Sequence, residues 1–136
     1  MEARMSIGEV ADATGLGVHT LRLYEREDLL INAVRRDAGG NRSYDADDVA
    51  WLRSCALLRS SGMSLKAIRE FASLVRQGSG TEEARLRVLE EHLRRIDRRR
   101  SEIEAAQRLV TEKIASYREH LRAGSVAGLW STGPER

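Results

Sequence analysis

Apolar residues recur every three or four positions along most of the chain, which is the spacing of one face of an α-helix. Residues 6–14 and 18–27 show this spacing in two short segments separated by a turn at Gly15. Ser6 and Glu9 have the S-x-x-E spacing of a capping box, in which each side chain binds a backbone N–H of the first turn. Two short helices across a glycine-containing turn predict a helix-turn-helix.

Residues 33–44 depart from the helical spacing and place Asp-Ala-Gly-Gly between two short extended stretches. Glycine adopts the positive φ that tight hairpins require, so this segment predicts a small β-hairpin, or wing. Two further helices are expected after the wing. Asp45 is expected to cap a helix that runs to about Ser60, and Ser64 is expected to cap a fourth helix with apolar positions up to Val75.

The clearest periodicity follows a flexible Gln-Gly-Ser-Gly segment at 77–80. From 81 to 123 the chain has no Gly or Pro, and apolar residues recur every seven positions on two registers. This heptad repeat predicts a coiled coil, because an amphipathic helix of this length needs a partner to cover its apolar stripe. A helix folded back onto its own domain is the alternative. Nine of the eleven seam positions are apolar: Leu86, Leu89, Leu93, Ile96, Ile103, Val110, Ile114, Tyr117 and Leu121.

Arg100 and Gln107 occupy the other two seam positions, about symmetrically around residue 103. Polar seam residues reduce stability but can fix register and strand orientation, and this placement suits an antiparallel pair with its twofold axis near the helix centre. We therefore expect a mainly α protein. Its predicted parts are a winged helix-turn-helix DNA-binding domain at 1–77, a dimerisation helix at 81–122 that forms an antiparallel coiled coil, and a disordered tail at 123–136 whose Trp130 packs loosely or docks on the partner.

Composition agrees with a small binding protein rather than an enzyme. The 136 residues include 32% charged and only 4% aromatic residues, so one chain buries a modest core. All of the 23 basic residues except Lys66 and Lys113 are arginines. Arginine suits phosphates and guanine edges, although a GC-rich genome would produce the same bias. The sequence shows no nucleophile–base set, phosphate-binding loop or metal cluster, so we expect no enzymatic activity, no metal and no cofactor.

Candidate DNA-binding residues gather on the second helix and on the wing. A helix fits the major groove, where Arg22 suits a guanine or a phosphate and the Tyr24 hydroxyl suits a phosphate. The wing arginines have no obvious structural task and would meet the sugar-phosphate backbone. On the helix, the alternative is that arginines pair with Glu25, Glu27 or Asp28 on a solvated face. The predicted set is His19, Thr20, Arg22, Tyr24, Arg26, Arg35, Arg36, Asn41, Arg42 and Tyr44.

These segments resemble the MerR family of bacterial transcriptional regulators. SIGEVADATGLGVHTLRLYEREDLL is similar to the family's opening helix-turn-helix, GGNRSYDADDVAWL to its wing and third helix, and SSGMSLKAIREF to its fourth helix. The resemblance covers residues 6–76 closely and the helix at 81–121 by type. It implies an antiparallel coiled-coil dimer that binds a near-palindromic promoter element with an overlong spacer. Such proteins distort the duplex so that RNA polymerase, an indirect partner, can use it.

Several positions depart from the family pattern, so the operator sequence does not carry over. Leu23 stands where the first of two tyrosines is common, and Asp28 replaces a frequent Gly. A frequent Pro is missing near Asn32. Asn41 replaces a common aromatic residue or Gly before the wing arginine, and Gly17 replaces a frequent Ser or Thr cap.

Any sensor function has to be sought outside the known metal and drug sites. Metal-sensing members use cysteines at the end of the long helix and drug-sensing members carry a large C-terminal domain, whereas this sequence has one cysteine and a short C-terminus. A branch with a short C-terminus looks most similar, and some of its members are thought to sense aldehydes through a cysteine of the third helix. Cys55 is a possible sensor, although it lies two positions before the expected place at Leu57. A buried, inert cysteine is the alternative. His92 and His120 are expected at solvated helix positions.

Two other functions fit the same pattern. One is an architectural or excisionase-like protein that bends DNA without an effector, and the other is a coiled-coil scaffold whose winged helix binds protein. The sequence has no apolar signal region and no membrane-spanning run, so we expect a cytoplasmic protein without a membrane partner. The effector, the operator and the choice between activation and repression stay open.

Overall fold

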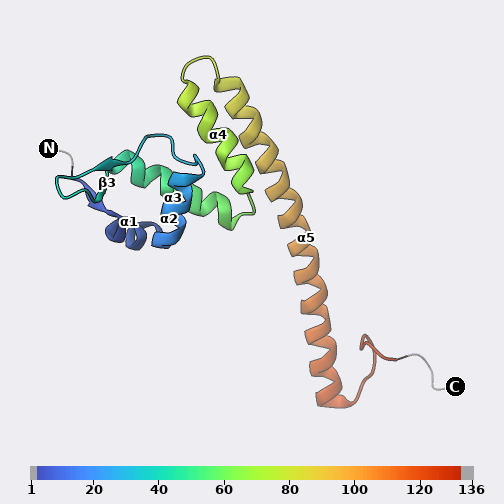
Figure 1. Ribbon diagram of the computed structural model, residues 1–136. Helices are drawn as coiled ribbons and strands as arrows, with labels where there is room; N and C mark the ends of the chain where they lie inside the picture. Colours follow the sequence, from blue (N-terminus) through green and yellow to red (C-terminus); the bar gives the residue numbers. More distant parts are fainter. Residues whose placement is uncertain (1–2, 133–136) are drawn as a thin grey trace. The chain divides into compact units, whose positions relative to one another are not determined.

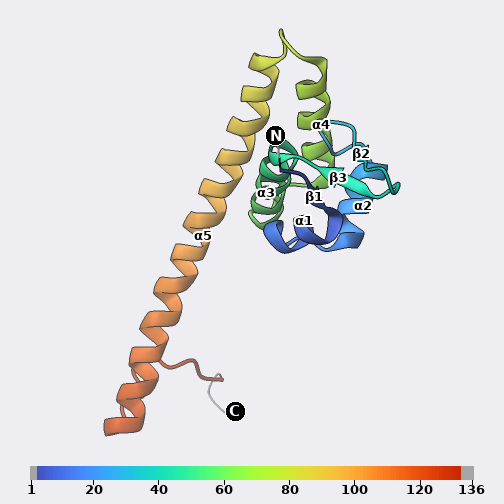
Figure 2. The same cartoon turned by 90° about the vertical axis from the view of Figure 1, so that its left-hand side faces the viewer.

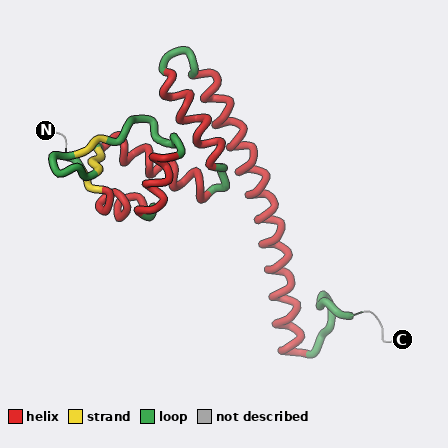
Figure 3. The backbone as a smooth tube through the Cα atoms, viewed as in Figure 1, coloured by secondary structure: helices red, strands yellow, loops and turns green. Residues whose placement is uncertain are grey.

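The computed structural model describes residues 3–132 and confirms a mainly α fold with a helix-turn-helix, a wing and a long C-terminal helix (Figure 1, Figure 3). The chain divides into two compact units between Leu93 and Arg94, so the first turns of the long helix belong with the winged helix. The elements in chain order are β1 (Met5–Ser6), α1 (Ile7–Thr14), α2 (Val18–Arg26), β2 (Arg35–Arg36), β3 (Arg42–Tyr44), α3 (Ala46–Ser60), α4 (Leu65–Gln77) and α5 (Glu82–Ala123).

The wing is part of a three-stranded antiparallel sheet in which β3 lies between β1 and β2. Arg36 of β2 lies directly opposite Arg42 of β3. The turn between them is closed by Asp37, whose Oδ1 accepts hydrogen bonds from the backbone N–H groups of Gly39 at 2.9 Å and Asn41 at 3.0 Å. The predicted hairpin is therefore present. Strand β1 was not among the predicted elements, because two residues are too few to show an alternating pattern.

The helix boundaries follow from side-chain caps. Ser6 and Glu9 form the predicted capping box at the start of α1, and Asp45 forms a second one with Asp48 at the start of α3. Gly15 ends α1 with a φ of 75°, a left-handed conformation that glycine adopts without a steric penalty. These local bonds satisfy N–H and C=O groups that have no partner inside a helix, and they fix where each helix begins and ends.

One apolar core holds the first unit together. Trp51 on α3 stacks on Phe71 of α4 with a centroid distance of 6.0 Å, and its Nε1–H donates to the carbonyl oxygen of Leu29 at 2.9 Å. The loop after α2 is thereby fixed against the third and fourth helices. The buried core residues are Val10, Leu21, Tyr24, Leu29, Tyr44, Val49, Leu52, Cys55, Met63, Ile68 and Ala72.

The apolar seam of α5 is largely uncovered in a single chain. Ile103, Val110 and Ile114 are exposed in the second unit, and Leu121 is 84% exposed. Of the nine apolar seam residues only Ile96 is half-buried; the others are all exposed. Exposed apolar area of this extent is unfavourable in water and indicates an interface. A helix that folded its seam back onto its own chain would have buried these side chains.

The segment after α5 forms contacts with that helix up to Trp130, while the disordered tail expected at 123–136 stays a prediction and residues 133–136 lie outside the described part. Lys113 Nζ donates to the carbonyl oxygen of Gly128 at 2.7 Å and lies 4.7 Å from the centroid of the Trp130 ring. The Trp130 and Tyr117 rings are tilted with centroids 6.5 Å apart. Trp130 therefore packs on its own helix, and glycine is favoured at 128, where φ is 78° and a Cβ would lie 2.5 Å from Ser116 Oγ.

Candidate nucleic-acid interface

Helix α2 buries one side and exposes the other. Leu21 and Tyr24 face the core, whereas His19, Arg22 and Arg26 are exposed. Thr20 is half-buried. The β2–β3 hairpin lies next to α2 in the first unit (Figure 2). The exposed face of α2 and the neighbouring wing can therefore contact the same DNA duplex. In a winged helix, the helix enters a groove and the wing contacts the flanking backbone.

Two glutamates in or next to α2 form ion pairs with arginines from other elements. Glu25 binds Arg42 of β3, and Glu27 binds Arg69 of α4 with an Nη2–Oε2 distance of 3.2 Å. Within residues 3–132, neither Arg22 nor Arg26 forms an ion pair, so the alternative of a neutralised solvated face does not describe this helix. The positive charges of the exposed face are left for an external anion.

The wing arginines differ from one another, which sequence reasoning did not anticipate. Arg35 is exposed and forms no ion pair within the described residues. Arg42 Nε donates to Glu25 Oε2 at 2.5 Å, and Arg36 Nη2 lies 4.0 Å from Glu25 Oε1. The hydrogen bond with Glu25 raises the pKa of Arg42. Arg36 and Arg42 therefore have a structural partner, which corrects the view that the hairpin arginines lack one.

Tyr24 and Tyr44 are not placed to contact DNA, and both assignments are corrected. Tyr24 is 1% exposed and Tyr44 is 2% exposed, because both rings are part of the core. Burial is the main cause that raises the pKa of each phenol. Their hydroxyl groups cannot reach a phosphate without opening the core. Asn41 is exposed at the tip of the wing and keeps its place in the candidate interface.

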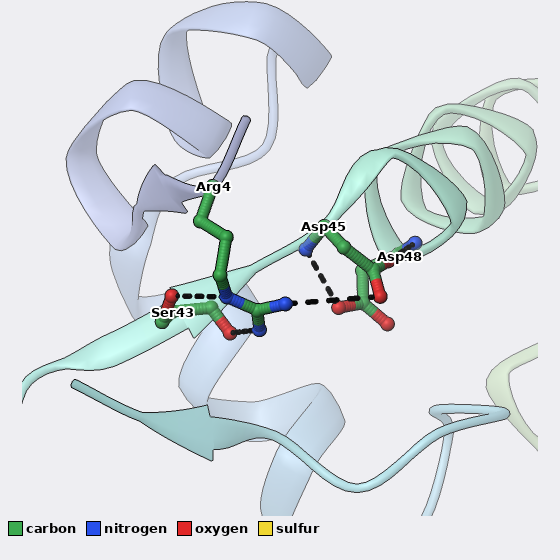
Figure 4. A network of polar contacts seen from close by, with 4 residues as sticks. All are labelled: Arg4, Ser43, Asp45 and Asp48. Carbon is green, nitrogen blue, oxygen red and sulfur yellow. Dashed lines mark hydrogen bonds and ion pairs between the residues drawn. The ribbon is translucent and has the colours of Figure 1, made fainter. Parts of the chain in front are cut away.

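Arg4 connects the wing to α3, a role that no local sequence pattern indicates (Figure 4). Its Nε donates to Ser43 Oγ at 2.7 Å, and its Nη2 donates to the Ser43 carbonyl oxygen at 2.9 Å. Its Nη1 lies 3.9 Å from Asp45 Oδ2. Asp45 also accepts from the backbone N–H of Asp48, which is the main cause that lowers the pKa of the Asp45 carboxyl. The strand β3 and the start of α3 are thereby held by one side chain.

Cys55 is buried in the middle of α3 rather than presented as a sensor. It is 0% exposed and belongs to the apolar core. Burial raises the pKa of its thiol to about 12. A reactive cysteine needs an accessible, electropositive surrounding that stabilises the thiolate. The structure therefore favours the inert alternative for this residue.

The two histidines of α5 are not at the solvated positions expected for them. His92 is 6% exposed, and its Nε2 lies 2.8 Å from Ser61 Oγ at the end of α3. Ser61 Oγ in turn donates to the carbonyl oxygen of Leu58 at 2.9 Å, so the imidazole Nε2–H is the donor to the hydroxyl. His120 is half-buried, with Nδ1 3.2 Å from the carbonyl oxygen of Ser125. His92 thus connects α5 to the residue that ends α3, and His120 connects the last turn of α5 to the segment that follows it.

Among residues 3–132 no group of three His, Cys, Asp or Glu side chains could hold a metal ion. None of the described helices has the length and apolar composition needed to cross a membrane. What the chain does present is a helix-turn-helix, an adjacent basic wing and a long helix with an exposed apolar seam. These features define a winged-helix DNA-binding protein.

Comparison with known proteins identifies the family. The chain matches the model of the MerR HTH family regulatory proteins over residues 5–74 and the MerR DNA-binding model over residues 49–113. An HTH-type transcriptional regulator of Haemophilus influenzae is 36% identical over 118 residues, which cover 87% of each chain. The chain belongs to the MerR family of transcriptional regulators, as its sequence motifs indicated.

Solved structures agree over nearly the whole length. HiNmlR, a MerR family regulator that lacks the sensor domain and was solved bound to promoter DNA, has a TM-score of 0.82 and 33% identity, covering 93% of this chain and 100% of that chain. A MerR family regulator from Listeria monocytogenes has a TM-score of 0.81 and 28% identity, covering 88% of this chain and 90% of that chain. The protein is thus similar to regulators of about its own length, one of which lacks a sensor domain.

Proposed function

We propose that this protein binds a near-palindromic promoter element as a homodimer and distorts the duplex, so that RNA polymerase responds to the altered DNA. One observation carries the proposal. Arg22, Arg26 and Arg35 are exposed on α2 and the wing, and none of them forms an ion pair within residues 3–132. Uncompensated positive charges on a helix and its neighbouring hairpin match the repeating negative charge of a DNA backbone. The promoter-bound structure of the similar HiNmlR supports the same conclusion.

Within this proposal the interface residues have two tasks. Arg22, His19 and Thr20 lie in the first half of α2 and reach base edges in the major groove. The remaining residues contact phosphates and sugars, which position the protein without reading sequence. This second set comprises Arg26, Arg35, Arg36, Asn41 and Arg42.

The proposed homodimer is an antiparallel coiled coil of two α5 helices. Its support is the exposed seam, with Ile103 at the centre and the polar Arg100 and Gln107 on either side. Burying the seam between two helices contributes a free energy of about 25 cal/mol for each Å² of apolar area removed from water. Pairing also links two winged helices, so that the dimer binds DNA more tightly than either winged helix does alone. We therefore propose the same division of the chain as the sequence predicted, with the DNA-binding domain at 1–77 and the coiled coil at 81–122.

We assign the protein no enzymatic activity and place its action in the cytoplasm, where a bacterial promoter is found. Membership of a family of transcriptional regulators supports both statements. Cys55 is not proposed as a sensor, because it is buried and its thiol has a raised pKa.

The direct test is footprinting on the promoter beside the protein's own coding region, with binding measured at several salt concentrations. Wild-type protein should protect a near-palindromic site, and its affinity should fall steeply as salt rises. The triple variant Arg22→Ala, Arg26→Ala, Arg35→Ala should lose protection. Arg108→Ala, which removes one exposed positive charge on α5, is the control and should bind as wild type. Equal protection by the triple variant would refute the assigned interface.

Transcription from the protected promoter, with and without the protein, then separates a regulator from an architectural protein. A regulator changes the transcript level when polymerase is present on the same DNA. An architectural protein bends the site and leaves the transcript level unchanged.

A further inference from the structure

Both strands of the wing are connected to the recognition helix α2 through one carboxylate. Glu25 Oε2 accepts a hydrogen bond from Arg42 Nε of β3 at 2.5 Å, and Glu25 Oε1 lies 4.0 Å from Arg36 Nη2 of β2. Each carboxylate oxygen therefore lies nearest to an arginine of a different strand. The side chains of Arg42 and Glu25 are only 22% and 29% exposed, so this pair is shielded from solvent more than an ordinary surface ion pair.

The sheet register explains why a carboxylate is needed there. Arg36 and Arg42 are directly opposite residues of β2 and β3, and like charges at opposite positions destabilise a strand pair. The negative charge of Glu25 lies beside both guanidinium groups and offsets their repulsion. Glu25 thus reduces the cost of two arginines at one register position of the wing.

Arg42 still has N–H donors without a hydrogen bond while it is bound to Glu25. A guanidinium has five N–H donors, and the hydrogen bond to Glu25 uses the one on Nε. Among residues 3–132 the structure gives the two Nη nitrogens of Arg42 no hydrogen bond. The pair of Nη groups suits a phosphate, which arginine binds through two parallel N–H donors.

We propose that Glu25 is a positioning residue of the DNA interface, which holds the Nε edge of Arg42 so that its Nη edge meets a phosphate at a fixed distance from α2. This inference rests on the proposed function, in which the wing arginines contact the sugar-phosphate backbone. Glu25 itself does not touch the DNA. Its effect passes through Arg42 and through the fixed placement of the wing against the recognition helix.

A Glu25 that competes with phosphate for Arg42 and a Glu25 that positions Arg42 predict opposite effects on DNA binding. If Glu25 only competed with phosphate for Arg42, removing it would free the arginine, strengthen binding and steepen the salt dependence. If Glu25 positions Arg42, removing it loses one ordered phosphate contact in each subunit. The slope of log K against log salt changes by about 0.9 per phosphate, so a dimer that loses two contacts becomes shallower by about 1.8.

The experiment measures affinity for a duplex carrying the footprinted site, from low to moderate salt, for the wild-type chain, four single variants and the double variant Glu25→Ala, Arg42→Ala. Glu25→Ala removes both the charge and the hydrogen-bond acceptor, and Glu25→Gln keeps an acceptor oxygen for Arg42 Nε. Arg42→Ala removes the arginine itself. Glu27→Ala is the matched control, because it removes the same charge one residue after α2 but its partner is Arg69 of α4. Thermal unfolding checks that each variant is folded at the assay temperature.

The positioning role requires a shallower slope and at least tenfold weaker binding for Glu25→Ala, a slope near that of wild type for Glu25→Gln, and no change for Glu27→Ala. Glu25→Ala should add no further loss once Arg42 is alanine. A steeper slope, or a lower unfolding temperature with an unchanged slope, overturns the inference and leaves the proposed function intact. If Arg42→Ala binds as wild type at every salt concentration, the wing contact of the proposed function is itself wrong.

Discussion

Cys55 should be almost unreactive toward electrophiles while the protein is folded. The thiol lies on α3 among core residues, is 0% exposed, and has a pKa raised to about 12 by burial. The thiolate is the nucleophile in alkylation, so both its population and its access to reagent are reduced. The perturbation is exposure of the native protein to iodoacetamide at pH 8, with urea-unfolded protein as the reference.

The size of the effect follows from the two pKa values. At pH 8 a thiol with the ordinary pKa of 9.0 is about one-tenth thiolate, whereas a thiol with a pKa of about 12 is roughly one ten-thousandth thiolate. The rate of alkylation should therefore be about 1,000-fold lower in the folded protein from ionisation alone. Exclusion of the reagent from the core lowers it further, so that modification proceeds through unfolding.

Mass spectrometry of timed samples gives both rates, because Cys55 is the single cysteine of the sequence. The Cys55→Ala variant identifies any modification at other residues. A native rate within tenfold of the unfolded rate would refute the reasoning, since it would require an accessible thiol with an ordinary pKa. That result would also restore the cysteine as a sensor candidate.

The same burial predicts how stability depends on pH. The folded-state pKa of Cys55 is raised above the unfolded value, so its contribution is complete below pH 9.0 and is lost as the pH rises toward 12. At pH 11 the loss relative to Cys55→Ala should be about 3 kcal/mol. Urea unfolding of both proteins at pH 8 and pH 11 measures this difference, and parallel behaviour of the two would contradict the raised pKa.

Three further predictions concern other parts of the chain. Ile103→Glu places a charge at the centre of the seam and should give a monomer at micromolar concentration in sedimentation velocity; a persistent dimer would exclude this seam. Arg4→Ala removes two hydrogen bonds to Ser43 and should lower the free energy of unfolding by about 2 kcal/mol, seen as a lower urea midpoint. Trp130→Ala should change it by less than about 1 kcal/mol, because the ring is 62% exposed and its contact with Lys113 is a surface cation–π pair.

The sequence predicted those features that local chemistry determines. The Ser6–Glu9 capping box and the end of α1 at Gly15 are set by residues within one turn of each other, and the structure has both. The wing followed from its glycines and the seam of α5 from its heptad spacing. Each of these signals depends on neighbours within a few positions, so no knowledge of the tertiary fold was needed to detect it.

Errors arose where a side chain's partner is distant in sequence. The helical spacing of α2 allowed Tyr24 to face either the core or the solvent, and packing decided for the core. Arg42 and Glu25 are 17 positions apart, and His92 lies 31 positions from Ser61, so their bonds exist only once the elements have packed. Periodicity places a residue on a face of a helix, but it does not say which other element covers that face.

The charge distribution explains why this chain requires two copies to bind DNA. The segment 18–44 has four acids against five arginines, and the structure assigns Glu25 and Glu27 to internal ion pairs. Within the described residues Arg22, Arg26 and Arg35 are the cations of this segment that form no ion pair. If Arg26, Arg35, Arg36 and Arg42 each meet a phosphate, as proposed, a dimer makes eight such contacts and its salt slope is about −7, whereas a monomer has about half that slope and correspondingly weak binding. In the proposed function, dimerisation through α5 and DNA contact through α2 therefore depend on each other, because a chain that balances most of its own charge gains affinity by linking two winged helices.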